Sequence, residues 1–186
     1  MHEILRSGQG IQTSRKTLIL HGMGGVGKTH VAIQYAREHQ NSFTSVFFLD
    51  GSSEDSLIQS FANVHRCIGE RRLVENPLSP HVSHAELNPR DLALETLEWF
   101  SLSGNTEWLL IYDNVDLGPE DPGGYRLVDY VPSMDTGSII VTSRLSTPPI
   151  AGHTHRLTLL APAESSQLLF ETMSRPPNSP DTQGTA

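Results

Sequence analysis

Short apolar runs alternate with longer amphipathic stretches along this chain, and the alternation predicts its secondary structure. A short apolar run bounded by turn residues is typical of a buried strand. Five such runs occupy residues 17–21, 45–50, 108–113, 137–144 and 156–160. Because strands and helices alternate, we expect an α/β fold with a mostly parallel sheet of five strands flanked by helices.

Between and after these runs, apolar residues recur at helical spacing in four stretches: 28–39, 52–68, 88–100 and 161–173. The apolar face of the second stretch consists of Leu57, Ile58, Phe61, Ala62 and Ile68. Ser52 and Asp55 have capping-box spacing at its start. Asn88 followed by Pro89 predicts the start of the third helix. Residues 69–88, which include two prolines, are expected to form a long loop.

The chain is expected to form one domain. At 186 residues it is long enough to bury a sizeable core. We place a helix or loop lead-in at residues 1–16, the domain at 17–173, and a disordered tail at 174–186. The tail is rich in proline, serine and threonine, a composition that cannot bury much apolar surface.

Composition narrows the class of protein. The hydrophobic content is 37% and the formal net charge is −8. A nucleic-acid-binding surface needs clustered lysine and arginine, so we expect no nucleic-acid partner. No apolar run has the length of a membrane span. The single cysteine, Cys67, is expected to face the core and cannot form an internal disulfide. A reducing, cytoplasmic location is therefore expected.

A glycine-rich segment joins the first strand to the first helix and matches the phosphate-loop pattern G-x-x-x-x-G-K-[ST]. Glycines let successive backbone N–H groups converge on anionic oxygens, and the helix start adds a positive dipole end. A lysine at this point can bind the β- and γ-phosphates, and a threonine hydroxyl can bind Mg²⁺. The alternative is a glycine-rich turn without a ligand. The predicted nucleotide-binding residues are Gly22, Met23, Gly24, Gly25, Val26, Gly27, Lys28, Thr29 and His30.

An aspartate follows the apolar strand at residues 108–112. Asp113 at the end of a buried strand carries a desolvation cost unless a partner offsets it, and a magnesium ion near the phosphate loop would do so. Thr29 and Asp113 are therefore the predicted metal ligands. Paired with the loop, this arrangement resembles a Walker B strand. The alternative is that Asp113 only caps the following turn.

An arginine ends the predicted strand at residues 137–144. At the carboxyl edge of a parallel sheet, Arg144 is expected to point into the crevice that holds the phosphates and to contact a γ-phosphate. The alternative is an ordinary surface arginine. Asp113, Asn114 and Arg144 are the candidate catalytic residues.

Four segments together resemble the nucleotide-binding core of the NB-ARC type, in the STAND class of P-loop NTPases. They are LHGMGGVGKTHVAIQYA, WLLIYDNVD, LVDYVPSMDTGSIIVTSR and LTLLAPAESSQLLF, and the form WLLIYDN is most similar to filamentous-fungal members. The resemblance implies a three-layer P-loop NTPase fold, with the 137–144 strand between the Walker A and Walker B strands. It implies ADP or ATP with Mg²⁺ as ligands, and a signalling role in NOD-like receptors of innate immunity.

Departures from the family pattern qualify this expectation. The adenine-contacting Gly-Arg segment and the downstream helical and winged-helix regions have no counterpart in the sequence. We therefore expect a fragment or a short form with an incomplete adenine pocket. Self-association, or other domains of a longer NLR-like protein, are the expected protein partners.

Three functions remain open from the sequence: a nucleotide-dependent signalling switch, a productive ATPase or phosphotransferase, and a scaffold remnant. Asn114 favours the switch, because hydrolytic relatives often place a carboxylate at this position to deprotonate water. Asp116 is the first candidate for a substitute base. The chain has no Asn-Lys-x-Asp motif, which argues against guanine recognition.

Overall fold

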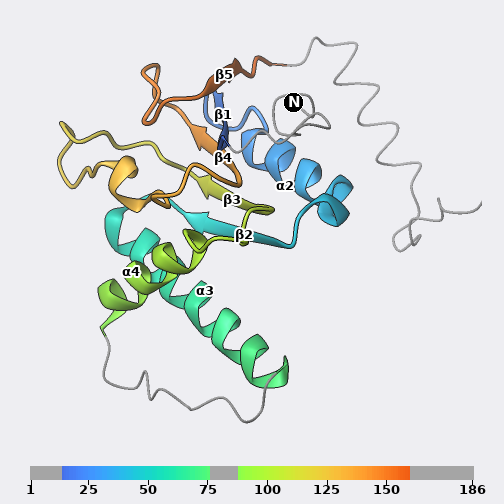
Figure 1. Ribbon diagram of the computed structural model, residues 1–186. Helices are drawn as coiled ribbons and strands as arrows, with labels where there is room; N and C mark the ends of the chain where they lie inside the picture. The colour runs from blue at the N-terminus through green and yellow to red at the C-terminus, as the bar shows by residue number, and fades with distance from the viewer. Residues whose placement is uncertain (1–13, 76–87, 160–186) are drawn as a thin grey trace, which may run out of the picture.

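A five-stranded parallel sheet forms the centre of the protein (Figure 1). The computed structural model describes residues 14–75 and 88–159. The strands are β1 (Lys16–His21), β2 (Ser45–Asp50), β3 (Trp108–Asp113), β4 (Ser138–Ser143) and β5 (His153–Arg156). Their order is β2-β3-β4-β1-β5, and every neighbouring pair is parallel. The predicted fold class is confirmed, including the position of β4 between β1 and β3.

Helices cover both faces of this sheet (Figure 1). Helix α2 (Lys28–Glu38) packs on one face, against β3 and β4. Helices α3 (Glu54–Glu75) and α4 (Pro89–Phe100) pack against each other, and α3 packs against β2 on the opposite face. In the described part of the chain, the connections contain the short 3₁₀ helices η1 (Gln40–Ser42) and η3 (Leu127–Tyr130).

The alternation of side chains along the strands divides the core in two. In β3, Leu109 and Ile111 pack in the cluster with α2, whereas Leu110 and Tyr112 pack in the larger cluster with α3 and α4. All six residues of β3 are buried, as are all six of β4. Strands buried on both faces have nearly continuous apolar sequences, which is why these two were easy to predict.

Helix α3 differs from its prediction at both ends. The Ser53 hydroxyl, and not that of Ser52, accepts the hydrogen bond from the backbone N–H of Ser56, at 3.1 Å. At the other end the helix continues to Glu75, so residues 69–75 of the predicted loop are helical. Cys67 is exposed, contrary to expectation. It lies about 100° around the helix from Ile68, which does pack on the core.

Strand β5 also departs from the prediction. The apolar run at 156–160 favoured a strand there, but the strand is His153–Arg156, whose four residues are all exposed. Its position is set by backbone pairing with β1, in which Leu18 lies opposite His153 and His21 opposite Arg156. A strand at the edge of a sheet needs backbone partners more than it needs apolar side chains.

The predicted helix at 161–173 and tail at 174–186 lie outside the described residues, as do residues 1–13 of the lead-in and residues 76–87 of the predicted loop. Within residues 14–75 and 88–159, none of the helices combines the length and apolar character that a membrane crossing requires.

Candidate functional site

The predicted phosphate loop connects β1 to α2 at the carboxyl edge of the sheet. Gly22 has a φ of 146°, and a Cβ placed on it would lie 2.4 Å from the carbonyl oxygen of Leu157. Gly27, at the start of α2, has a φ of 96°. Gly25 has a φ of 78°. Residues other than glycine rarely adopt such φ values, so the path of the loop depends on these three glycines.

The N-terminus of α2 lacks the caps that the other two described α-helices have. Among the described residues, no side chain accepts a hydrogen bond from the backbone N–H groups of its first turn, and that turn contains no acidic residue. By contrast, Ser53 and Asn88 cap α3 and α4, and each of these helices has an acidic residue in its first turn. The free N–H groups and positive dipole end of α2 therefore favour an anionic ligand.

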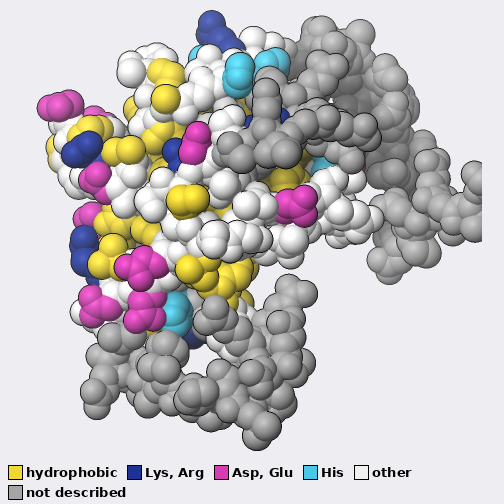
Figure 2. Space-filling view, in the orientation of Figure 1, with side chains coloured by type: hydrophobic (Ala, Val, Ile, Leu, Met, Phe, Trp, Pro, Cys, Tyr) yellow, Lys and Arg dark blue, Asp and Glu magenta, His cyan; other side chains and the backbone are white. Residues whose placement is uncertain are grey.

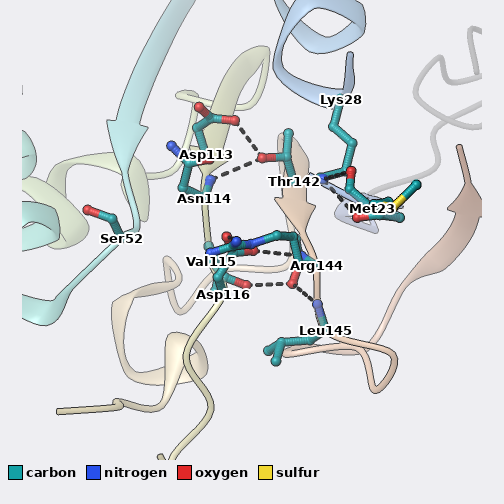
Figure 3. A network of polar contacts seen from close by, with 12 residues as sticks. Met23, Lys28, Ser52, Asp113, Asn114, Val115, Asp116, Thr142, Arg144 and Leu145 are labelled. Atoms are coloured by element: carbon teal, nitrogen blue, oxygen red, sulfur yellow. Dashed lines mark hydrogen bonds and ion pairs between the residues drawn. The ribbon is translucent and has the colours of Figure 1, made fainter. Parts of the chain in front are cut away.

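Lys28 extends back over the loop that precedes it. Its Nζ donates hydrogen bonds to the carbonyl oxygens of Gly22, at 2.9 Å, and Met23, at 3.0 Å (Figure 3). The residue is only 9% exposed, so its charge is held at the loop and away from bulk water. An ammonium group has three donors, which leaves one N–H for an anion in the loop.

Asp113 lies at the end of β3, 5% exposed, and is held by two hydroxyl groups. Thr29 donates a hydrogen bond to its Oδ1 at 2.8 Å, and Thr142 donates to the same oxygen at 2.5 Å. The structure thus brings the two predicted metal ligands together across a separation of 84 residues. Carboxylate and hydroxyl oxygens are the hard ligands that Mg²⁺ prefers, and Mg²⁺ commonly takes only one or two of them from the protein. These residues fit the ion.

Thr142 contacts the predicted site residues but was not itself predicted from the sequence. It is fully buried in β4, and besides bonding Asp113 it accepts a hydrogen bond from the backbone N–H of Asn114 at 3.0 Å. The sequence signal that could have identified Thr142 is a polar residue within the apolar run of β4, which pairs with β3, the predicted Walker B strand. Asn114 itself is exposed and has a φ of 59°, a left-handed conformation that asparagine tolerates better than most residues.

Arg144 lies one residue beyond β4 and is paired with Asp116. Its backbone N–H donates to Asp116 Oδ1 at 2.6 Å, and its Nε donates to Asp116 Oδ2 at 2.5 Å (Figure 3). Both carboxylate oxygens of Asp116 therefore bind Arg144. The residue that the sequence suggested as a substitute base is thus the ion-pair partner of Arg144.

A pocket of about 860 Å³ brings these groups together. From the predicted set it is lined by Gly24, Gly25, Gly27, Lys28, Thr29, His30, Asn114 and Arg144. The lining that was not predicted as site residues comprises Ile33, Ser52, Asp116 and Leu117. The pocket lining does not include four of the predicted residues, which are Gly22, Met23, Val26 and Asp113. Gly22 and Met23 instead hold Lys28 through their carbonyl groups.

Tyrosine hydroxyl groups brace the wall of this pocket that follows β2. Tyr125 donates a hydrogen bond to the carbonyl oxygen of Gly51 at 2.6 Å, directly before the lining residue Ser52. Tyr130 donates to Glu54 at 2.5 Å. Burial raises the pKa of Tyr125 and, with the Glu54 hydrogen bond, raises the pKa of Tyr130 to about 12. Both groups therefore stay protonated and serve as donors at neutral pH.

No protein-family model matches the chain, and none of the curated proteins compared with it matches. Among solved structures, a chain of the structure described as Drosophila ORC bound to DNA is similar, with a TM-score of 0.50 and 16% sequence identity. The similarity covers 91% of this chain and 44% of that chain, so this chain spans less than half the length of the protein it matches.

At such low identity the likeness establishes the fold alone. The protein has an α/β fold with a five-stranded, all-parallel sheet of order 2-3-4-1-5 flanked by helices, similar to the fold of part of that ORC chain.

Proposed function

We propose that this chain is an adenine-nucleotide-binding module of the NB-ARC type, which binds ADP or ATP with Mg²⁺ and acts as a nucleotide-dependent signalling switch. The observation that carries the proposal is the uncapped N-terminus of α2, which follows a glycine loop held by Lys28 and opens into a pocket of about 860 Å³. A purely structural turn has no need of an open helix start, a nearly buried lysine and an adjacent pocket together.

The residues of the site take separate roles in this proposal. The loop and the first turn of α2 bind the phosphates through backbone N–H groups, and Lys28 contributes its free N–H and its charge. Thr29 and Asp113 hold Mg²⁺, which offsets phosphate charge when bound. Arg144 contacts a γ-phosphate, because its side chain lines the same pocket.

Slow hydrolysis follows from the surroundings of Asn114. This amide lines the pocket where a base would be needed, and an amide cannot accept a proton from water. Asp116 is the only carboxylate among the described lining residues, and both of its oxygens bind Arg144. A nucleotide that is hydrolysed slowly marks a state of the protein, which suits a switch better than a productive ATPase.

The proposed partners follow the same argument. Adenine is favoured over guanine because the sequence lacks a guanine-reading motif, and further partners are a second copy of this chain or other domains of a longer NLR-like protein. The similar structure is bound to DNA, but we do not propose that this chain binds DNA. The net charge is −8, and on the face seen in Figure 2 lysine and arginine side chains lie apart, among acidic and uncharged ones.

A titration of the whole chain with ADP and ATP, each with and without Mg²⁺, tests the proposal. We expect both nucleotides to bind, with an affinity that Mg²⁺ increases. GTP serves as the base-specificity control and should bind more weakly than ATP. An Asp113→Asn variant, which keeps the shape but removes the charge, should lose the Mg²⁺ effect.

The competing functions give different results. A scaffold remnant binds neither nucleotide at millimolar concentration. A productive ATPase binds ATP and releases phosphate at several turnovers per second, within the usual enzyme range of about 1–10³ per second. Either result would replace the switch proposal.

A further inference from the structure

Beyond the end of β3, Val115 forms hydrogen bonds with the last two residues of β4. The backbone N–H of Val115 donates to the carbonyl oxygen of Thr142 at 3.0 Å, and the Ser143 hydroxyl donates to the carbonyl oxygen of Val115 at 2.5 Å. These bonds bring Asp116 beside Arg144, although 28 residues separate them in the sequence. Their relative position is thus set by the sheet.

Asp116 holds Arg144 at two points. One carboxylate oxygen binds the backbone N–H and the other binds Nε of the guanidinium group. The Asp116 side chain is 15% exposed and that of Arg144 is 63% exposed, so the acid is the fixed member of the pair. Anchoring at both the backbone and Nε restricts the side-chain torsions between them and orients the plane of the guanidinium group.

The rest of the guanidinium group remains available. It carries five N–H donors, of which Nε–H is one, so Nη1 and Nη2 retain four. Within residues 14–75 and 88–159, Arg144 makes no other hydrogen bond or ion pair. Its stem runs beside the phosphate loop, since a Cβ placed on Gly24 would lie 3.8 Å from Cδ of Arg144.

We propose that Asp116 is a positioning residue for a nucleoside triphosphate, an inference that rests on the proposed nucleotide-binding function. By holding Nε and the backbone of Arg144, it presents the Nη1–Nη2 edge to the terminal phosphate. A planar fork held in place binds a phosphate through two parallel hydrogen bonds with little further loss of side-chain freedom. Asp116 thereby sets the preference of the site for a triphosphate over a diphosphate.

Calorimetric titration of the whole chain with Mg·ATP and Mg·ADP tests this role through the ratio of the two dissociation constants. The variants are Asp116→Asn, Arg144→Ala, Arg144→Lys and the double variant Asp116→Asn/Arg144→Ala. Asp121→Asn is the matched control, because Asp121 is an exposed aspartate in the same connection that bonds the backbone N–H of Gly118 and does not line the pocket.

If Asp116 positions Arg144, Asp116→Asn lowers the ATP preference by about tenfold and leaves ADP affinity unchanged. Arg144→Ala lowers it by at least as much, and the double variant equals Arg144→Ala, since the two residues act as one unit. Arg144→Lys behaves like Arg144→Ala, because lysine keeps the charge but has no fork for Asp116 to hold. Asp121→Asn matches wild type.

Four results would overturn the inference. Tighter ATP binding in Asp116→Asn would mean that the carboxylate competes with the phosphate for Arg144. Equal loss for ATP and ADP, with a lower melting temperature, would make the pair a structural brace. If wild type binds both nucleotides equally and Arg144→Ala has no effect, Asp116 has no positioning role, although the chain still binds nucleotide as proposed. If wild type binds neither nucleotide, the proposed function itself fails and this inference fails with it.

Discussion

Lys28 offers the sharpest test of the phosphate site, because the chain contains only one other lysine. The two are Lys16, at the first residue of β1, and Lys28, just beyond the loop that follows the last residue of β1. The variants Lys28→Met and Lys16→Met make the same chemical change at opposite edges of the sheet. Methionine retains an unbranched apolar side chain, which suits the nearly buried stem of Lys28.

The expected magnitude follows from the contacts of Nζ. Two of its three donors bind the carbonyl oxygens of Gly22 and Met23, so the third can form one charge-assisted hydrogen bond with a phosphate oxygen. Such a bond contributes about 1.5–3 kcal/mol, which corresponds to a loss of affinity of roughly tenfold to hundredfold in Lys28→Met. Lys16→Met is expected to bind ADP as wild type does, and both variants should remain folded.

Calorimetric titration with Mg·ADP, combined with thermal melting of each variant, measures these quantities. The reasoning would be refuted if Lys28→Met bound ADP as tightly as wild type while folding normally. An equal loss in Lys16→Met would also refute it, since the effect would then come from overall charge and not from the loop.

Three further predictions concern hydrolysis, the metal site and pH. Asn114→Asp adds a carboxylate at a left-handed backbone position that aspartate tolerates. The rate of ATP hydrolysis, measured by phosphate release, should therefore rise by at most about 10²–10⁴-fold. An unchanged rate would mean that the Asn114 amide does not limit hydrolysis. Thr142→Val removes a hydrogen-bond donor to Asp113 and an acceptor for the Asn114 N–H, so the free energy of unfolding measured in urea should fall by about 1–3 kcal/mol. The Mg²⁺ dependence of nucleotide binding should also become weaker. An unchanged free energy of unfolding would contradict the importance of these two hydrogen bonds. The pKa of Tyr130 is raised from 10.0 to about 12, so between these pH values the folded state keeps a proton that the unfolded state releases. The protonated Tyr130 hydroxyl therefore contributes fully to the stability of the fold below pH 10, and this contribution is lost as the pH rises through about 12. The decline in stability over that range should be smaller in Tyr130→Phe, and an identical decline would reject the assignment.

The sequence by itself determined the central strands and the glycine loop. β3 and β4 are buried on both faces, so their apolar runs predicted them within one residue at each end. The strand–loop–helix order predicted where Lys28 and Thr29 stand. The asparagine before α4 predicted a cap, and Asn88 does accept hydrogen bonds from the N–H groups of Arg90 and Asp91. These features depend on local chemistry, which a sequence records directly.

Only the tertiary structure decided the features that depend on pairing between distant segments. The position of β5 follows its register with β1, and the contacts of Asp116 with Arg144 follow the adjacency of β3 and β4. Thr142 became part of the site because the sheet places its hydroxyl against Asp113. The sequence shows which residue types are present, whereas the distance between a carboxylate and its partner is fixed by strand order and register, and these are set by packing across the whole sheet.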